Sequence, residues 1–309
     1  MIVTREAAVR PAWPFRLPGA SPDGVLRRRG QVIERLLHVD GSPVVVQAWQ
    51  PRRDLVRIRA RAGAGREARE AIAQMRFALS VDDDLSGFCR AFRDDPLIGA
   101  SVRRRPWLRL TRRPEPYEAL AWTITEQLIE YRRAVGIQRR ILSAFGRRGG
   151  ADGLVDLPDA GTVAGAAPAR LEAAGLSASR SITLRRASRL VAAGRIDLRS
   201  PDHGTTCRRL MTVPGIGRWT ADVFAVVGQG RYDAIPAGDL GYLKWCGRLL
   251  RGRPGAIADE EEVRELFSAY GRWAALAGAH ALGITAPAAA RLHRVGTRSS
   301  ARSAGYSPA

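Results

Sequence analysis

Residues 210–224, LMTVPGIGRWTADVF, break a helical pattern with a proline and two glycines and then resume it. Pro214 cannot continue a helix, and Gly215 and Gly217 allow a positive φ and a close approach of the backbone. The segment therefore predicts two helices joined by a short turn. The first N–H groups of the second helix have no partner within that helix, so the turn can bind an anion such as phosphate. An ordinary turn between packed helices would give the same pattern.

The chain of 309 residues carries an excess of positive charge that makes phosphate the expected anion. It has 50 Lys and Arg residues against 30 Asp and Glu, a net charge of +20, and its only lysine is Lys244. A charge of this size favours a polyanionic partner, nucleic acid before an anionic membrane. A GC-rich genome also enriches arginine, but the excess over acidic residues still indicates such a partner.

The remaining composition bounds the class of protein. Apolar residues make up 45% of the chain, enough for a packed core. Cys89, Cys207 and Cys246 lie far apart without a CxxC motif, which favours reduced thiols over a zinc or iron–sulfur site. No apolar stretch reaches membrane-spanning length, and the N-terminus has no signal-peptide pattern. We therefore expect a soluble, cytoplasmic, nucleoid-associated protein that does not bind a membrane.

Residues 24–61 carry the signals of β-strands. DLVRIRARA (54–62) alternates polar and apolar residues, and PVVVQAW (43–49) is rich in β-branched residues after a turn. Amphipathic helices are predicted at about 65–79 and 82–93, the second starting with three aspartates that suit a helix N-terminus. Residues 1–112 are thus predicted to form a small α+β domain with an antiparallel sheet.

After the sequence RPEP (113–116) every periodic segment is typical of a helix. We expect residues 113–286 to form a helical domain with a helix-hairpin-helix at 203–228, which makes the chain mostly α. From Pro287 onward the residues are small and basic, so 287–309 are predicted to be a disordered tail. The expected helices lie at about 116–130, 131–146, 168–175, 179–194, 203–212, 218–228, 239–250, 259–269 and 271–283.

Four stretches together resemble the helix-hairpin-helix DNA glycosylase superfamily, in its bacterial 3-methyladenine DNA glycosylase II type. They agree with the family in order and cover almost all of the helical part, while the N-terminal sheet fits the family's small β domain in outline. The resemblance implies two helical subdomains that flank a cleft for duplex DNA. The stretches are YEALAWTITEQLIEYRRAVGIQRRILSAFG (117–146), LEAAGLSASRSITLRRASRLVAAGRIDL (171–198), LMTVPGIGRWTADVFAV (210–226) and DAIPAGDLGYLK (233–244).

The resemblance also implies how the chain meets DNA. The hairpin would dock a phosphate, and its carbonyl groups would hold a Na⁺ or K⁺ ion that bridges to the DNA backbone. Leu128 matches the family's wedge, an apolar side chain that fills the gap left by an extruded nucleotide. The alternative for Leu128 is a buried leucine of an amphipathic helix. The implied DNA-binding residues are Gln127, Leu128, Pro214, Gly215, Gly217 and Thr220, and the implied cation ligands are the carbonyls of Met211, Val213 and Ile216.

Asp239 matches the family's catalytic carboxylate. Taken alone, it is more readily interpreted as the N-cap of the helix that follows. The two interpretations are compatible, because a helix N-terminus keeps a carboxylate ionised. An ionised carboxylate is what N-glycosidic cleavage needs, since the sugar develops oxocarbenium character and water must be oriented.

Two tryptophans match the aromatic walls that the family places around the flipped base. Trp219 and Trp273 would stack on N-alkylated purines, whose positive charge adds a cation–π attraction. A core tryptophan is the alternative for each. Trp219 also stands where glycosylases that cleave the backbone carry a lysine nucleophile. Since a lyase needs that amine, the resemblance implies a monofunctional enzyme.

Four positions depart from the family's pattern and concern the breadth of substrates. Glu126 replaces a small residue near the DNA, Glu130 a serine, Val223 an aromatic residue of the pocket, and Gly238 an acidic residue before Asp239. The pocket is therefore less aromatic than is usual in the family.

The sequence as a whole predicts a monomeric, monofunctional DNA glycosylase of base excision repair that needs no cofactor. It would flip alkylated purines such as 3-methyladenine from duplex DNA and hydrolyse their N-glycosidic bond. The alternatives are a non-catalytic helix-hairpin-helix DNA-binding protein and a glycosylase for a deaminated or oxidised base.

Overall fold

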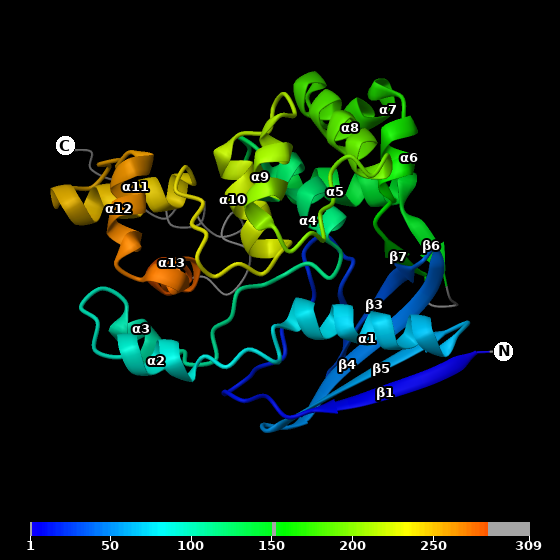
Figure 1. Ribbon diagram of the computed structural model, residues 1–309, viewed down its shortest axis with the longest axis horizontal. Coiled ribbons are helices and arrows are strands. Elements are labelled where there is room, and N and C mark those ends of the chain that lie inside the picture. The colour runs from blue at the N-terminus through cyan, green and yellow to red at the C-terminus, as the bar shows by residue number, and fades with distance from the viewer. Residues whose placement is uncertain (1, 150–152, 284–309) are drawn as a thin grey trace, which may run out of the picture.

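The computed structural model describes residues 2–149 and 153–283, and its N-terminal part is an antiparallel sheet with helix α1 (Gly65–Leu79) across one face (Figure 1). Strand β5 buries Val56, Ile58 and Ala60 and exposes the arginines between them, as its alternation predicts. These residues and one face of α1 form the sheet core. The strands are β1 (Val3–Val9), β2 (Arg27–Arg29), β3 (Val32–Val39), β4 (Ser42–Arg52) and β5 (Leu55–Ala62), in the order β1-β5-β4-β3-β2.

Strand β1 lies outside the expected strand region, which began at residue 24. Its sequence, VTREAAV, interrupts the apolar alternation with charged residues. It forms the edge of the sheet beside β5, where Glu6 accepts hydrogen bonds from Arg57 at 2.6 Å and Arg59 at 3.0 Å. These cross-strand ion pairs add to the packing of Ala7 and Val9 against the sheet core, and an edge strand tolerates the charged residues between them because one side is open to water.

The predicted helix at 82–93 is shorter than expected, since α2 spans Ser86–Phe92. The aspartates before it have other partners. Asp82 pairs with Arg76 at 2.7 Å, and Asp83 accepts hydrogen bonds from Arg112 at 2.8 Å and from Tyr232 at 2.5 Å. A further helix, α3 (Gly99–Arg104), follows and was not expected.

The helical part agrees with the prediction of a mostly α architecture. In Figure 1, α11–α13 lie at the left above α2 and α3, and α4–α10 extend from the centre to the upper right, above the sheet. The helices are α4 (Pro116–Glu126), α5 (Tyr131–Phe145), α6 (Ala160–Gly165), α7 (Pro168–Ala173), α8 (Ala178–Ala192), α9 (His203–Met211), α10 (Arg218–Val227), α11 (Leu240–Arg251), α12 (Glu260–Ser268) and α13 (Ala274–Leu282), with a 3₁₀ turn at Gly271–Trp273 before α13.

Two expectations about this part are wrong. Helix α4 ends at Glu126 and not at 130, because Gln127 and Leu128 leave helical geometry. The segment after α5 is not only helical: β6 (Arg147–Gly149) and β7 (Leu154–Asp156) form a short antiparallel pair before α6. Such three-residue strands are too short for a periodic pattern to reveal. The tail predicted at 287–309 lies outside the described residues.

The helices pack around two separate apolar cores. The helical core contains Leu120 of α4, Leu184 of α8 and Phe224 of α10. The C-terminal core contains Phe88 of α2, Tyr242 of α11 and Phe267 of α12, with apolar residues of α3 and α13. The chain passes from the first to the second between α10 and α11, so the segment before Asp239 connects the two helical subdomains.

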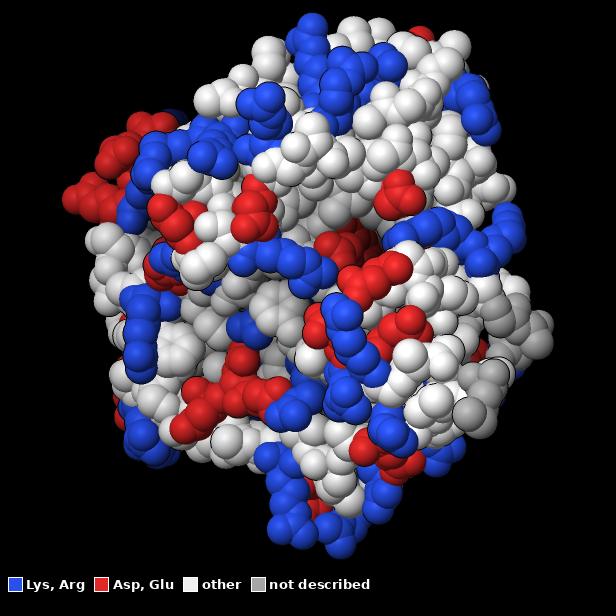
Figure 2. Space-filling model, turned by 45° about the vertical axis from the view of Figure 1, so that its right-hand side comes forward, with Lys and Arg blue, Asp and Glu red and all other residues white. Residues whose placement is uncertain are grey.

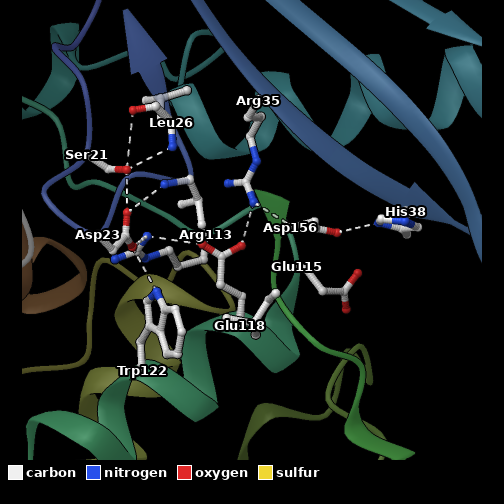
Figure 3. Close-up of polar contacts among 12 residues, drawn as sticks. Ser21, Asp23, Leu26, Arg35, His38, Arg113, Glu115, Glu118, Trp122 and Asp156 are labelled. Carbon is white, nitrogen blue, oxygen red and sulfur yellow. Dashed lines mark hydrogen bonds and ion pairs between the residues drawn. The ribbon is translucent and has the colours of Figure 1, made fainter. Parts of the chain in front are cut away.

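A buried network of charges joins the sheet to α4 (Figure 3). Arg35 of β3 donates a hydrogen bond to Glu118 at 2.8 Å, and their side chains are 4% and 0% exposed. Arg113, which precedes α4, donates to the other oxygen of Glu118 at 3.1 Å and to Asp23 at 2.9 Å. Trp122 of α4 donates to Asp23 at 2.8 Å. Every charge in this chain of contacts thus faces one of opposite sign.

The network continues to the hairpin of β6 and β7. Asp156 lies 3.5 Å from Arg35, 2.9 Å from His38 and 2.9 Å from Arg147. At the other end, burial acts to raise the pKa of Asp23, but the Arg113 guanidinium and hydrogen-bond donors outweigh it and hold that pKa below its usual value. Asp23 therefore stays ionised at neutral pH.

We expect Glu118→Gln to destabilise the protein by about 3–5 kcal/mol, because it leaves Arg35 and Arg113 buried without their shared counter-charge. Urea unfolding at pH 7 measures this free energy. Asp54→Asn removes one charge of an exposed pair with Arg52 and is expected to cost less than about 1 kcal/mol. Equal small losses for both variants would contradict a structural role for the network.

Candidate active site

The segment 210–224 folds as predicted, into α9, a short turn and α10. Gly215 has a φ of +91°, and a Cβ there would clash with Thr183, whose hydroxyl donates to the Pro214 carbonyl at 3.1 Å. Gly217 is the N-cap of α10 and supplies no side-chain acceptor for the N–H groups of the first turn. Because Pro214, Gly215 and Gly217 are all exposed, these N–H groups can meet an external anion.

The carbonyls expected to hold a monovalent cation belong to the same turn. Met211 is the last residue of α9, and Val213 and Ile216 are buried. The Val213 carbonyl accepts the Ile216 N–H at 2.9 Å, which leaves that oxygen one further lone pair. The donor set is therefore neutral main-chain oxygen. Among the described residues, no group of three His, Cys, Asp or Glu side chains could hold a metal ion.

The loop after α4 is fixed to this turn by Gln127. Its Nε2 donates to the Gly215 carbonyl and to the Thr220 hydroxyl, each at 2.8 Å. Thr220 as a whole is 2% exposed, so its hydroxyl holds Gln127 and is not open to an external partner. The structure thus brings together Gln127 and the hairpin residues that the resemblance implies.

Leu128 follows directly and projects away from the protein. It has a φ of +53° and is 104% exposed. The interpretation of Leu128 as a buried helical leucine is therefore wrong. A non-glycine residue in the left-handed region costs roughly 1–2 kcal/mol, and an exposed leucine gains nothing from burial. The position is strained and apolar at once, which points to a role outside the folding of the chain.

Asp239 is the N-cap of α11 and is 7% exposed. Its carboxylate accepts the Gly241 N–H at 2.9 Å, and its own N–H donates to the Pro236 carbonyl at 2.9 Å. The capping role expected from the sequence is confirmed. A Cβ on the preceding Gly238 would lie 2.6 Å from Glu260 Oε1, so the carboxylate of Glu260 occupies the space beside Gly238.

The two tryptophans belong to different subdomains. Trp219, in the first turn of α10, is half-buried against the helical core. Trp273 is half-buried in the C-terminal core, with its ring centroid 5.7 Å from that of Phe88 and 5.5 Å from that of Tyr232. Each therefore has a packing role of its own. Two cavities, of about 380 and 320 Å³, border α1 and include neither tryptophan nor Asp239.

Glu126 belongs to this region as well, although sequence reasoning treated it only as a departure. It is half-buried at the end of α4, and its carboxylate accepts a hydrogen bond from Gln138 of α5 at 3.0 Å. Burial, with smaller contributions from the carboxylates of Asp23 and Asp239, raises the pKa of Glu126 to about 7 against the opposing effects of Arg113 and Gln138. Asp239 and Glu126 therefore lie near enough to interact electrostatically.

The chain resembles known proteins in sequence. No family model matches the chain. It is 28% identical over 223 residues, 70% of its length, to a probable bifunctional transcriptional activator/DNA repair enzyme of Mycobacterium tuberculosis, covering 42% of that protein. It is 24% identical over 200 residues to the DNA-3-methyladenine glycosylase of Bacillus subtilis, covering 63% of this chain and 65% of that one. The chain thus spans 42% of the length of the first relative and 65% of the second.

Solved structures show the same fold. A 3-methyladenine DNA glycosylase from Archaeoglobus fulgidus superposes with a TM-score of 0.75 at 19% identity, covering 89% of this chain and 97% of that one. An 8-oxoguanine glycosylase/lyase from Clostridium acetobutylicum superposes with a TM-score of 0.65 at 18% identity, covering 91% and 97%.

The chain therefore shares the fold of these glycosylase structures. Its sequence relatives carry the name of the 3-methyladenine type, in agreement with the resemblance of the four stretches. The fold itself does not select a lesion, because the structures that share it include proteins named for 3-methyladenine and for 8-oxoguanine. None of its described helices is long and apolar enough to span a bilayer.

We expect Glu126→Gln to stabilise the protein at pH 8. The raised pKa means that the folded state holds the Glu126 proton more tightly than the unfolded state does. Wild-type stability is therefore lost as the pH rises from about 4.5, where the unfolded state ionises, to about 7.

Glutamine does not titrate, so the variant should gain on the order of 1–3 kcal/mol over wild type at pH 8 and little at pH 4. Thermal or urea unfolding at both pH values measures the difference. The exposed Glu130, in the same loop, provides the control Glu130→Gln, for which no such pH-dependent gain is expected. A gain that is equal at both pH values would contradict the electrostatic account.

Proposed function

We propose that this protein is a monofunctional DNA glycosylase that extrudes alkylated purines from duplex DNA and hydrolyses their N-glycosidic bond. The observation that carries the proposal is Asp239, a nearly buried carboxylate held at a helix N-cap between two helical subdomains, after a hairpin with open N–H groups. The relatives named for 3-methyladenine support the choice of alkylated bases.

Duplex DNA is the proposed partner, bound by a single copy of the chain. The net charge of +20 supports attraction to phosphates. Figure 2 shows basic side chains in separate clusters with acidic groups between them, and some of the acidic groups lie inside a recess. Such a surface attracts DNA along several contacts and not through one continuous patch. The N–H groups at the hairpin, with or without a Na⁺ or K⁺ ion on its carbonyls, would bind one phosphate.

The proposed reaction uses groups of the chain in three places. Leu128 enters the base stack and fills the gap behind the extruded nucleotide. Trp219 and Trp273 stack on the base. Asp239 stabilises the positive charge that develops on the sugar as the C1′–N bond breaks, and it orients the water that adds to C1′. Trp219 stands at the position of the lyase lysine, so no amine is available there for a covalent intermediate.

Asp239→Asn tests the proposal. Asparagine keeps an acceptor for the Gly241 N–H and can still cap α11, but it removes the negative charge. We expect single-turnover release of 3-methyladenine from methylated duplex DNA to fall by about 10²–10³-fold, with unchanged melting temperature.

The matched control is Asp259→Asn, which changes the exposed N-cap of α12, an acceptor of the Glu262 N–H at 2.9 Å. It should retain the wild-type rate. Full activity of Asp239→Asn would show that Asp239 caps α11 and has no catalytic role. A wild-type protein that releases no alkylated base would support the non-catalytic DNA-binding alternative.

Leu128→Ala should separate capture of the base from folding. Because the side chain is fully exposed, we expect the free energy of unfolding to change by less than about 0.5 kcal/mol. Affinity for duplex DNA with an abasic site should fall several-fold more than affinity for undamaged duplex, as measured by fluorescence anisotropy. Leu250→Ala, which changes another exposed leucine, should alter neither affinity. Equal losses on both DNAs would contradict the wedge.

A further inference from the structure

Glu126 occupies a defined place beside the proposed wedge. It is the last residue of α4, and the next two residues are Gln127, which is held to the hairpin, and Leu128, which projects from the surface. In the proposed complex Leu128 fills the gap left by the extruded nucleotide. Glu126 precedes Leu128 by two residues and lies between Leu128 and the body of the protein. An extruded base moves toward the body of the protein.

The side chain of Glu126 is turned into the protein and not toward solvent. Its carboxylate accepts the amide of Gln138, a residue that is 1% exposed and also donates to Thr125 at 3.1 Å. Its electrostatic coupling to Asp239 places the two carboxylates in one region, although they come from different subdomains. A base whose sugar contacts Asp239 would thus be within reach of a second carboxyl group, that of Glu126, which is held separately by Gln138.

The charges that act on Glu126 come from several elements and have both signs. Arg113 and Asp23, from the segments before α4 and before β2, act with opposite sign. Asp239 at the N-cap of α11 adds negative charge. Arg180 of α8 adds positive charge nearby, since it donates to the Thr125 carbonyl at 2.9 Å. Burial outweighs the counter-charge of Arg113 and raises the pKa of Glu126 to about 7, so both protonation states are accessible near neutral pH.

We propose that Glu126 determines base specificity by hydrogen-bonding the extruded purine, as a donor to neutral bases when protonated and as an ion-pair partner of cationic bases when ionised. This rests on the proposed glycosylase function. A charge-assisted contact is about twice as strong as a neutral one, so ionised Glu126 favours N-alkylated, cationic purines. The protonated form accommodates neutral purines, whose ring nitrogens accept a hydrogen bond.

The test compares two substrates at two pH values. Single-turnover rates are measured at pH 6 and pH 8 for 3-methyladenine, a cationic base in DNA, and for hypoxanthine, a neutral one, in otherwise equal duplexes. For wild type, the ratio of the 3-methyladenine rate to the hypoxanthine rate should rise with pH. For Glu126→Gln it should be the same at both pH values and on the order of tenfold lower than the wild-type ratio at pH 8.

Two further variants keep the result interpretable. Glu126→Asp retains the charge and should retain a ratio that rises with pH, while Glu130→Gln removes an exposed charge of the same loop and should behave as wild type. The inference is overturned if Glu126→Gln follows the wild-type ratio, or if Glu130→Gln reproduces its effect. Release of neither base by wild type would overturn the proposed function and this inference with it. Activity with an unaltered ratio would overturn this inference alone.

Discussion

The ion network between β3 and α4 is the contact on which the rest of the arrangement depends. Glu118, Trp122 and Glu126 are spaced four residues apart, so they lie along one face of α4. The first two are held by Arg35, Arg113 and Asp23 in a region closed to water. Because Arg113 and Asp23 also set the pKa of Glu126, the contact that joins the sheet to the helical part reaches the electrostatics of the candidate site.

Buried ion pairs do not by themselves make a protein more stable, because apolar residues of similar volume often give the same or a greater free energy of unfolding. What the network provides here is a fixed position for α4. Its N-terminal end is joined to the sheet, and its C-terminal end is joined to the hairpin through Gln127. The exposed Leu128 is therefore presented by a helix that is held at both ends. A site on a fixed element can keep a strained, apolar residue in water.

The parts of the fold and of the candidate site that depend on neighbouring residues in the sequence could be predicted. The glycines and proline of the hairpin, the alternation of β5 and the capping role of Asp239 follow from backbone geometry and periodicity, and the structure confirms them. The end of α4 could not be predicted, because the apolar residues after Glu126 continue a helical pattern while Gln127 bonds to a hairpin almost ninety residues away.

Strand β1 and the environment of Glu126 also depend on residues that are distant in the sequence. Edge strand β1 depends on Arg57 and Arg59 of a distant strand, and the environment of Glu126 depends on Arg113, Gln138 and Asp239 together. No local pattern reports such contacts. For Glu126 the available signal was chemical: a carboxylate directly before two predicted DNA-binding residues, where negative charge would oppose DNA unless it served another purpose.

The measurement that tests the account most directly is base release from a panel of duplex oligonucleotides, each with one lesion. The account predicts that wild type releases a free alkylated purine and leaves an intact strand with an abasic site, which breaks only on treatment with alkali. Release of no alkylated base would contradict it. So would strand breakage without alkali accompanied by a covalent complex trapped by borohydride, because that reaction needs the amine that Trp219 replaces.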